Sequence, residues 1–418
     1  MLYLCMDYRQ RLLEIAAFLK PYQTIWQNEI MLLYPDPLKF HPIDWVNELA
    51  LVTNKLEVIR LEKKDAAGLV HNPDLLAFYN RIEELCCFPA IPEFAPLPFD
   101  YKTFLYMIPK KQYEIKRLAP LINERYQNLN IEKIIDIGGG IGLLAQTLNN
   151  QYGLQIVSLD MDPILQKTGS ERYAPLAKNP ENKVNYQNIK VTDEDTSFSS
   201  LLTTASMSIG LHTCGELANA QIKLSSNKKI RSIINFGCCY QLLEDEDSQN
   251  LSAFAQEMPD KIFMKHFALT LAARAHRKMD EKDYDLKIKV KQYRYSIHIL
   301  LHDKLGIKEL VSLGNSKPQL YDESFGHYAQ EQLRRINVAA PPLEELNQFF
   351  ENEAHQQLIW KMIAAGLIRN AFGRLMELYI LLDRVIYLEE KNYQVELMEF
   401  FDEATSPRNL GIVATLPV

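Results

Sequence analysis

A strand-like run that leads directly into a glycine-rich loop is the feature that most constrains this 418-residue chain. The stretch IIDIGGGIGLLAQTL, residues 134–148, has glycines at Gly138, Gly140 and Gly142. Glycine allows sharp turns and lets a ligand come close to backbone N–H groups. A strand, such a loop and a helix in this order predict a nucleotide-type binding site in an α/β fold.

Further short apolar runs follow, separated by stretches of helix length. With the run before the loop they span 133–137, 154–160, 183–189, 207–212 and 231–236. This alternation predicts parallel βαβ units. Two more strand-like runs lie at 292–301 and 409–417, with mostly helical patterns between them and throughout residues 1–125.

Composition favours a globular protein without a membrane span. The N-terminus does not have a signal-peptide pattern, and no apolar run approaches the ~20 residues that a transmembrane helix needs. Six cysteines in a chain of this length do not indicate a disulfide scaffold. We therefore expect reduced thiols and a cytoplasmic location.

Two acids beside the glycine loop indicate which cofactor binds there. Asp160 ends the second strand, eighteen residues after Gly142, where it can accept hydrogen bonds from both ribose hydroxyls of a nucleoside. Asp136 opens the loop and can hold an amino group. This pattern favours S-adenosylmethionine over NAD. After the third strand, Asp193 or Asp195 is a candidate for the adenine amino group, and we favour Asp193.

Histidine and cysteine side chains follow the fourth and fifth strands. These are His212, Cys214, Cys238, Cys239 and Tyr240. In an open α/β sheet, ligands bind beyond the carboxyl ends of the strands, so these residues are expected to line the pocket for the methyl acceptor. His212 is the candidate general base, because the unperturbed pKa of a histidine, ~6.5, suits that role.

The three cysteines allow several interpretations. They are small, weakly polar walls of the pocket, or one of them is a nucleophile that attacks a pyrimidine, or they pack structurally. A zinc site from His212, Cys214 and Cys238 or Cys239 lacks a C-x-x-C pair and a clear fourth ligand. We prefer the pocket wall and predict no metal.

Several motifs resemble those of the methyltransferase-like protein 25 family, which is also described as containing a ribosomal RNA adenine dimethylase domain. The motifs are MIPKKQYEI (107–115), GLHTCGELA (210–218), FGCCYQLL (236–243), LLDRVIYLEE (381–390) and FDEATSPRNLGIVA (401–414). The first departs from the family pattern at Ile108 and Tyr113. The histidine and cysteine motifs are also similar to those of a tRNA 2′-O-methyltransferase family.

The resemblance implies a Rossmann-like class I methyltransferase with a mostly parallel seven-stranded sheet. It assigns 292–301 as the sixth strand and 409–416 as the antiparallel seventh. The expected ranges are an N-terminal helical region at 1–125, a methyltransferase core at 126–304, a helical insertion at 305–404 and the last strand at 405–418. Lys110, Lys111 and Arg408 are the candidates for substrate binding.

The methyl acceptor is expected to be RNA, either tRNA or rRNA. Residues 274–294 hold eight Lys/Arg against four acids, and Tyr284, Tyr293 and Tyr295 in this stretch are candidates for base stacking. An ordinary solvated face gives the same charge pattern. The acidic stretch 341–405 opposes RNA binding. A protein substrate, or a scaffold that binds the cofactor without turnover, are the alternatives.

Overall fold

The structure is a computed structural model that describes residues 6–52, 55–62, 65–91, 104–105, 107–178, 183–193, 196–243, 245–274 and 281–417. Asp195 and residues 275–280 of the basic stretch lie outside these residues. Two compact units make up the chain. Unit 1 comprises Met1–Lys20, Leu85–Arg277 and Arg374–Val418, and unit 2 comprises Pro21–Glu84 and Lys278–Gly373. The four ranges expected from the sequence are continuous, whereas both units are built from separate segments.

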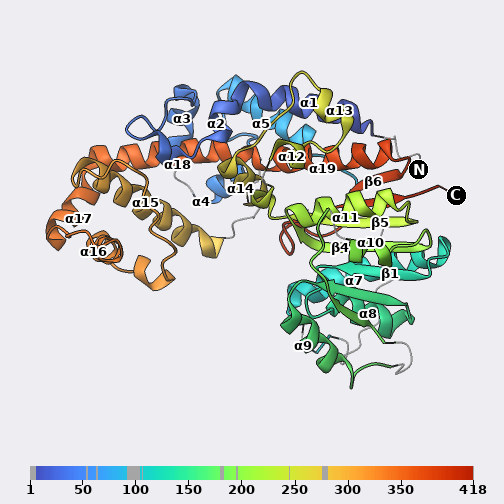
Figure 1. The fold of residues 1–418 in the computed structure, drawn as a ribbon. Coiled ribbons are helices and arrows are strands. Elements are labelled where there is room, and N and C mark those ends of the chain that lie inside the picture. The colour runs from blue at the N-terminus through green and yellow to red at the C-terminus, as the bar shows by residue number, and fades with distance from the viewer. Residues whose placement is uncertain are drawn as a thin grey trace. The chain divides into compact units, whose positions relative to one another are not determined.

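Unit 1 contains a seven-stranded sheet with the order β3-β2-β1-β4-β5-β7-β6 (Figure 1). The strands are β1 (Lys133–Ile137), β2 (Ile156–Asp160), β3 (Asn185–Asn188), β4 (Ser206–Cys214), β5 (Ser232–Cys238), β6 (Gln394–Glu399) and β7 (Leu410–Thr415). The pairings among β1 to β5 are parallel, and β7 is antiparallel to both of its neighbours. The α/β sheet is therefore present but mixed, and the all-parallel pairing extends only over the first five strands.

The predicted sixth strand at 292–301 is wrong. These residues belong to helix α15 (Glu281–Asp303), and the strand lies instead at Gln394–Glu399. The aromatic and β-branched content of 292–301 suggests a strand, but Tyr293, Ile297 and Leu300 are buried at spacings of four and three, which is helical. The helical insertion therefore precedes β6, and β6 pairs directly with β7.

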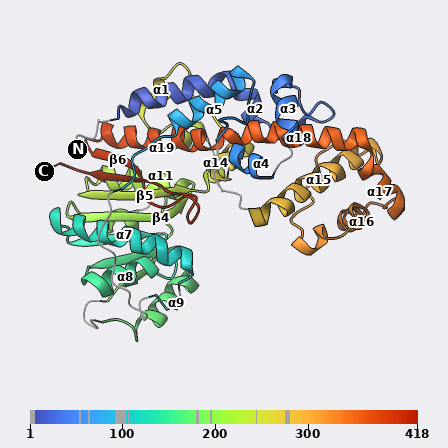
Figure 2. The ribbon, with the colours of Figure 1, turned by 180° about the vertical axis from the view of Figure 1, so that it is seen from behind.

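Helices surround the sheet of unit 1. They are α1 (Tyr8–Leu19), α7 (Pro109–Asn128), α8 (Leu143–Tyr152), α9 (Pro163–Tyr173), α10 (Thr196–Leu201), α11 (Glu216–Asn227), α12 (Glu246–Gln249), α13 (Ala253–Glu257), α14 (His266–Arg274) and α19 (Gly373–Glu390). Figures 1 and 2, which view the molecule from opposite sides, show α11 beside β4 and β5 and α8 beside α7.

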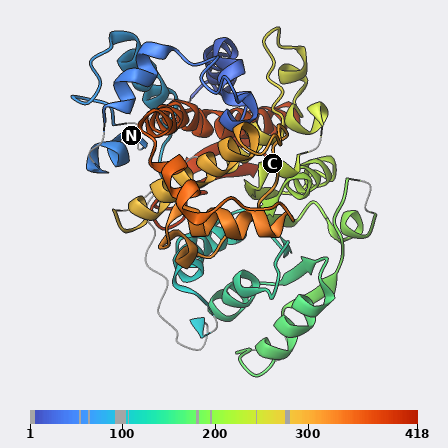
Figure 3. The same cartoon turned by 90° about the vertical axis from the view of Figure 1, so that its left-hand side faces the viewer.

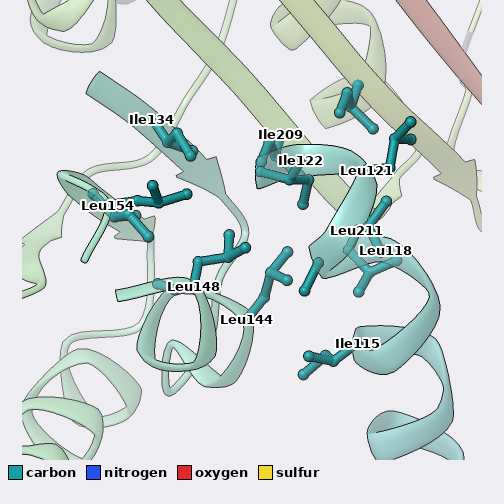
Figure 4. Close-up of a cluster of buried hydrophobic side chains, with 14 of the residues drawn as sticks. Ile115, Leu118, Leu121, Ile122, Ile134, Leu144, Leu148, Leu154, Ile209 and Leu211 are labelled. Atoms are coloured by element: carbon teal, nitrogen blue, oxygen red, sulfur yellow. The ribbon is translucent and has the colours of Figure 1, made fainter. Parts of the chain in front are cut away.

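Helices α7 and α8 pack on one face of this sheet. Figure 4 shows Ile115, Leu118 and Ile122 of α7 together with Leu144 and Leu148 of α8, close to Ile134, Ile209 and Leu211 of the strands. Helix α11 packs on the opposite face, because its Gln221 donates to Ser208 Oγ at 3.3 Å and Ser208 alternates with Ile209 along β4. This packing fixes the position of α7 relative to the carboxyl end of β4.

Unit 2 is helical. Its helices are α2 (Gln23–Gln27), α3 (Ile43–Ala50), α4 (Lys55–Glu62), α5 (Pro73–Leu85), α15, α16 (Phe325–Arg335), α17 (Leu343–Glu351) and α18 (Glu353–Ala371). Figure 3 draws α15 to α17 in gold and orange. Tyr293 is 3% exposed among aromatic rings of α16 and α17, and Tyr284 is 6% exposed. Such burial contradicts the expected stacking of these two tyrosines on bases. Among the described residues, no helix has both the length and the apolar character of a membrane span.

Candidate active site

The glycine loop turns between β1 and α8, where three glycines adopt left-handed backbone angles. Gly138, Gly140 and Gly142 have φ values of 66°, 60° and 74°. At Gly142 a Cβ atom would also lie 2.7 Å from Cε1 of Tyr186, so a side chain is excluded both by the backbone and by space. The backbone N–H of Gly140 donates to Oδ2 of Asp160 at 2.9 Å, which ties the loop to the end of β2.

A pocket of about 680 Å³ lies at the carboxyl ends of the strands, within the size range of small-molecule sites. Three predicted cofactor residues line it: Gly138, Asp160 and Asp193. Cys214 also lines it. Asp160 accepts from two backbone N–H groups, of Gly140 and Asp162. A carboxylate offers about four acceptor positions, so this one keeps capacity for a ligand.

Asp136 has a buried carboxyl oxygen that lacks a hydrogen-bond partner in the described part of the chain. The residue is 3% exposed, and Oδ2 is the unpartnered atom. Burial raises the pKa of Asp136 to about 7; the charge of Lys111 opposes this rise and that of Asp160 adds to it. An unpaired buried carboxyl group at a ligand loop is costly unless a bound donor or cation satisfies it.

Asp193 forms an ion pair across the pocket wall. Its Oδ2 lies 2.6 Å from Nζ of Lys223, and both residues line the pocket. Asp193 therefore lines the pocket with a cation already beside one of its oxygens, and its contact with the adenine amino group stays a prediction.

His212 is held by a carboxylate from α7. Its Nε2 lies 2.9 Å from Oε1 of Glu114, which also accepts from Ser406 Oγ at 2.7 Å. Burial raises the pKa of Glu114, but the hydrogen bonds and charge of His212 and the hydrogen bond of Ser406 outweigh it and lower the pKa to about 2. An ionised carboxylate only accepts, so Nε2 carries a proton, and in a neutral imidazole the lone pair is then on Nδ1.

The backbone at His212 is unusual for a strand residue. His212 has φ 70°, and the register of β4 against β5 shifts between Leu211 and Thr213. A bulge of this kind redirects side chains and is frequent beside active sites. The bulge thus explains how a strand residue turns toward α7.

Lys110 and Lys111 lie on the first turn of α7 near the same carboxylate. Their Nζ atoms are 3.7 Å and 3.8 Å from the two oxygens of Glu114. Burial lowers the pKa of Lys111, and the charges of Glu114 and Asp136 oppose this shift. The structure therefore brings both lysines to the carboxylate that holds His212, and the charge of Asp136 also acts on Lys111.

The three cysteines come together at the ends of β4 and β5. Their sulfur atoms all lie within 4.8 Å of one another, with 3.4 Å between Cys214 and Cys238. The hydrogen bond with Cys238 lowers the pKa of Cys214 to about 6 against the effect of burial, and the same hydrogen bond and burial raise the pKa of Cys238. Burial raises the pKa of Cys239.

Tyr240 and Arg408 take different positions. Tyr240 is 3% exposed, and its hydroxyl lies 3.2 Å from both the Gly237 carbonyl and Glu377 Oε1, so this side chain is part of the packed interior and does not line the pocket. Arg408 donates through Nη2 to the Ala273 carbonyl at 2.7 Å. Its charge also contributes to lowering the pKa of Cys214, which places it near the thiols.

Comparison with known proteins identifies the kind of domain that carries this site. Residues 110–246 match a family described as a methyltransferase domain. This chain contains a methyltransferase domain. The matched range includes the glycine loop, His212 and all three clustered cysteines.

Two curated proteins are similar to about half of this chain. They are "Probable methyltransferase-like protein 25" of Mus musculus and of Homo sapiens, 24% identical over 225 and 220 residues. Each match covers 49% of this chain and 36% of the relative, so it spans about a third of the relatives' length. The predicted resemblance to the methyltransferase-like protein 25 family is confirmed.

Two residues of the methyltransferase domain's histidine site were missed from the sequence. Glu114 lies in the motif MIPKKQYEI, so its place in a family motif was the available signal. Ser406 lies between β6 and β7, within SPRN, and only the folded chain brings it to Glu114. No local pattern links residues 114, 212 and 406.

Proposed function

We propose that this chain is an S-adenosylmethionine-dependent methyltransferase that acts on RNA in the cytoplasm. The unpartnered, buried Asp136 carboxyl oxygen at the glycine loop is the observation that carries the cofactor assignment. S-adenosylmethionine carries an amino group, which matches this carboxyl group in charge and supplies the missing donor.

The remaining predicted residues fit other parts of the cofactor. Asp160, at the pocket wall, suits the ribose hydroxyls, and Asp193 suits a donor such as the adenine amino group. Gly138, Gly140 and Gly142 leave the loop backbone free of side chains. Bound S-adenosylmethionine would supply an electrophilic methyl group on a sulfonium.

The histidine site favours a hydroxyl acceptor. Because Glu114 holds Nε2, His212 would take the acceptor proton at Nδ1, and the carboxylate would stabilise the resulting imidazolium. A neutral nitrogen acceptor needs no such base at the moment of transfer, whereas a ribose hydroxyl gains from one. This chemistry, and the similarity of the histidine and cysteine motifs to a tRNA 2′-O-methyltransferase family, support RNA, whether tRNA or rRNA.

Two observations bear on the surroundings of the reaction. Among the described residues, Cys86, Cys87, Cys214, Cys238 and Cys239 form no disulfide bond, which suits a reducing compartment. The basic stretch is described at residue 274 and over 281–294, where Tyr284 and Tyr293 are buried. Its proposed contribution is therefore phosphate contacts by lysines. A protein acceptor, or cofactor binding without turnover, would leave the same pocket.

Transfer of radiolabelled methyl into a cell extract tests the proposal. Purified protein is incubated with labelled S-adenosylmethionine and extract, and aliquots are then treated with ribonuclease or protease. Label lost only to ribonuclease supports an RNA acceptor. Label lost only to protease would replace RNA with a protein substrate. Cofactor binding by calorimetry without any label transfer would leave a binding scaffold.

A further inference from the structure

We infer that Cys214, Cys238 and Cys239 form a metal site for a thiophilic divalent cation, Zn²⁺, with one coordination position open. Among the described residues, the sulfur atoms of these three cysteines lie close enough together to bind one metal ion. This site differs from the combination considered from the sequence, because Nε2 of His212 is directed to Glu114 and His212 is not part of the group. Metal binding here requires no cofactor and is independent of methyl transfer.

The distances between the sulfur atoms suit zinc. A tetrahedral site with Zn–S bonds of about 2.3 Å separates its sulfur atoms by about 3.8 Å. Cys238 and Cys239 have their sulfur atoms 3.8 Å apart, and those of Cys214 and Cys238 are 3.4 Å apart. All three sulfur atoms lie within 4.8 Å of one another, so each is near the spacing that a shared ion requires.

The backbone holds the cluster in place. Cys214 and Cys238 are direct partners on the paired strands β4 and β5, in the register that follows the bulge at His212. Successive strand residues point to opposite faces, so Cys239 would normally turn away from Cys238. Cys239 instead has φ 50°, a strained conformation for a residue other than glycine, and this turn keeps its sulfur beside the other two.

Exposure and charge also fit a site with an open position. Cys238 is 4% exposed, whereas Cys214 lines the 680 Å³ pocket, so an ion bound by all three sulfur atoms would meet the pocket on the side of Cys214. Three thiolates and Zn²⁺ carry a net charge of about −1. The nearby Arg408 guanidinium, whose charge acts on Cys214 and Cys239, would balance it.

Metal titration of the reduced full-length chain tests the site. We expect one equivalent of Zn²⁺ to bind in competition with a chromophoric chelator, in the absence of S-adenosylmethionine. Co²⁺ in place of zinc should give thiolate-to-metal charge transfer in the near ultraviolet and intense visible bands of tetrahedral geometry. Cys214→Ser and Cys239→Ser should each weaken zinc binding by at least about tenfold.

The adjacent pair Cys86–Cys87 provides the control. Cys87→Ser removes an exposed thiol outside the cluster and should leave zinc affinity unchanged. Circular dichroism checks folding, and using the half-exposed Cys214 and Cys239 avoids substituting the buried Cys238. Absence of binding, equal losses in the Cys87 variant, or a Cys214–Cys238 disulfide that persists under reductant would overturn the assignment.

Discussion

Nε2 of His212 lies 2.9 Å from Oε1 of Glu114, a carboxylate that is 1% exposed. The contact joins the bulge of β4 to the first turns of α7, across 98 residues of sequence. A base whose tautomer is fixed by a buried acid is typical of proton-transfer sites. The arrangement supports the proposal that His212 is the base and that Glu114 positions it.

Replacing His212 should lower turnover with little effect on cofactor binding. His212→Asn is the suitable change, because asparagine tolerates the positive φ that His212 adopts. Loss of a general base typically costs about 10²–10⁴-fold in rate, while S-adenosylmethionine affinity should stay within a few-fold. Steady-state kinetics and calorimetry measure the two quantities. Unchanged turnover would exclude His212 as the base.

Glu114→Gln should change how stability depends on pH. The folded-state pKa of Glu114 is lowered from 4.5 to about 2, so its ionised form stabilises the fold above pH 4.5, and this contribution is lost as pH falls toward 2. The variant should be less stable than the wild type at neutral pH, and the difference should shrink across that window. Urea unfolding at several pH values measures it. A difference that does not vary with pH would contradict the prediction.

S-adenosylmethionine affinity should rise with pH as Asp136 ionises. The pKa of Asp136 is raised to about 7, whereas an α-amino group stays protonated below about 7.7. Affinity should therefore increase from about pH 5 to pH 7, and in Asp136→Asn it should be weak and nearly independent of pH. Calorimetry across this range measures both.

The same shift has a consequence for the protein without ligand. The folded-state pKa of Asp136 is raised from 3.8 to about 7. The free energy of unfolding that Asp136 contributes is therefore lost as pH rises from 3.8 to about 7, and Asp136→Asn should remove this loss. If wild-type affinity does not change with pH, Asp136 does not hold the amino group.

Asp160→Ala should abolish measurable S-adenosylmethionine binding at concentrations that saturate the wild type. The change removes a pocket carboxylate and its hydrogen bond from the Gly140 N–H. Asp162→Ala is the matched control, because Asp162 lies two residues away, does not line the pocket and caps α9. That variant should lose about 1 kcal/mol of stability and keep its affinity within a few-fold. If both variants lose affinity equally, the loss in Asp160→Ala would come from local unfolding after β2 and not from a missing contact with the cofactor.

Gly142→Ala should destabilise the domain more than Gly153→Ala. Both glycines have positive φ, 74° and 69°, so both variants pay the same backbone penalty. A Cβ at Gly142 would also meet the ring of Tyr186, whereas nothing lies within 4 Å of a Cβ at Gly153. We expect the Gly142 variant to lose about 1–3 kcal/mol more in thermal or urea unfolding. Equal losses would show that the ring of Tyr186 moves away freely.

Local patterns in the sequence predicted a large part of the sheet. The runs at 133–137, 154–160 and 231–236 coincide with β1, β2 and β5 to within two residues, because buried parallel strands are continuous apolar runs. The glycines at 138, 140 and 142 adopt the positive φ angles that their residue type permits.

Residues 292–301 mark the limit of such patterns. These residues fit a strand by their composition and a helix by the spacing of their apolar side chains. The packing of α15 in the hydrophobic core of unit 2 decides in favour of the helix. Strand β6 was missed because only half of its residues are apolar, which is a weak strand signal in the sequence. Its hydrogen-bonded pairing with β7 makes this segment a strand.

The sequence by itself determined which residues stand at the strand ends: the glycines, Asp136, Asp160, His212 and the cysteines. Parallel strands end at the same edge of a sheet, so their order along the chain is enough to place them together. Only the tertiary structure decided what each side chain meets there. The pairing of Glu114 with His212 and Ser406, and the convergence of three sulfur atoms, depend on helix packing, a bulge and a left-handed turn that bring together atoms far apart in sequence.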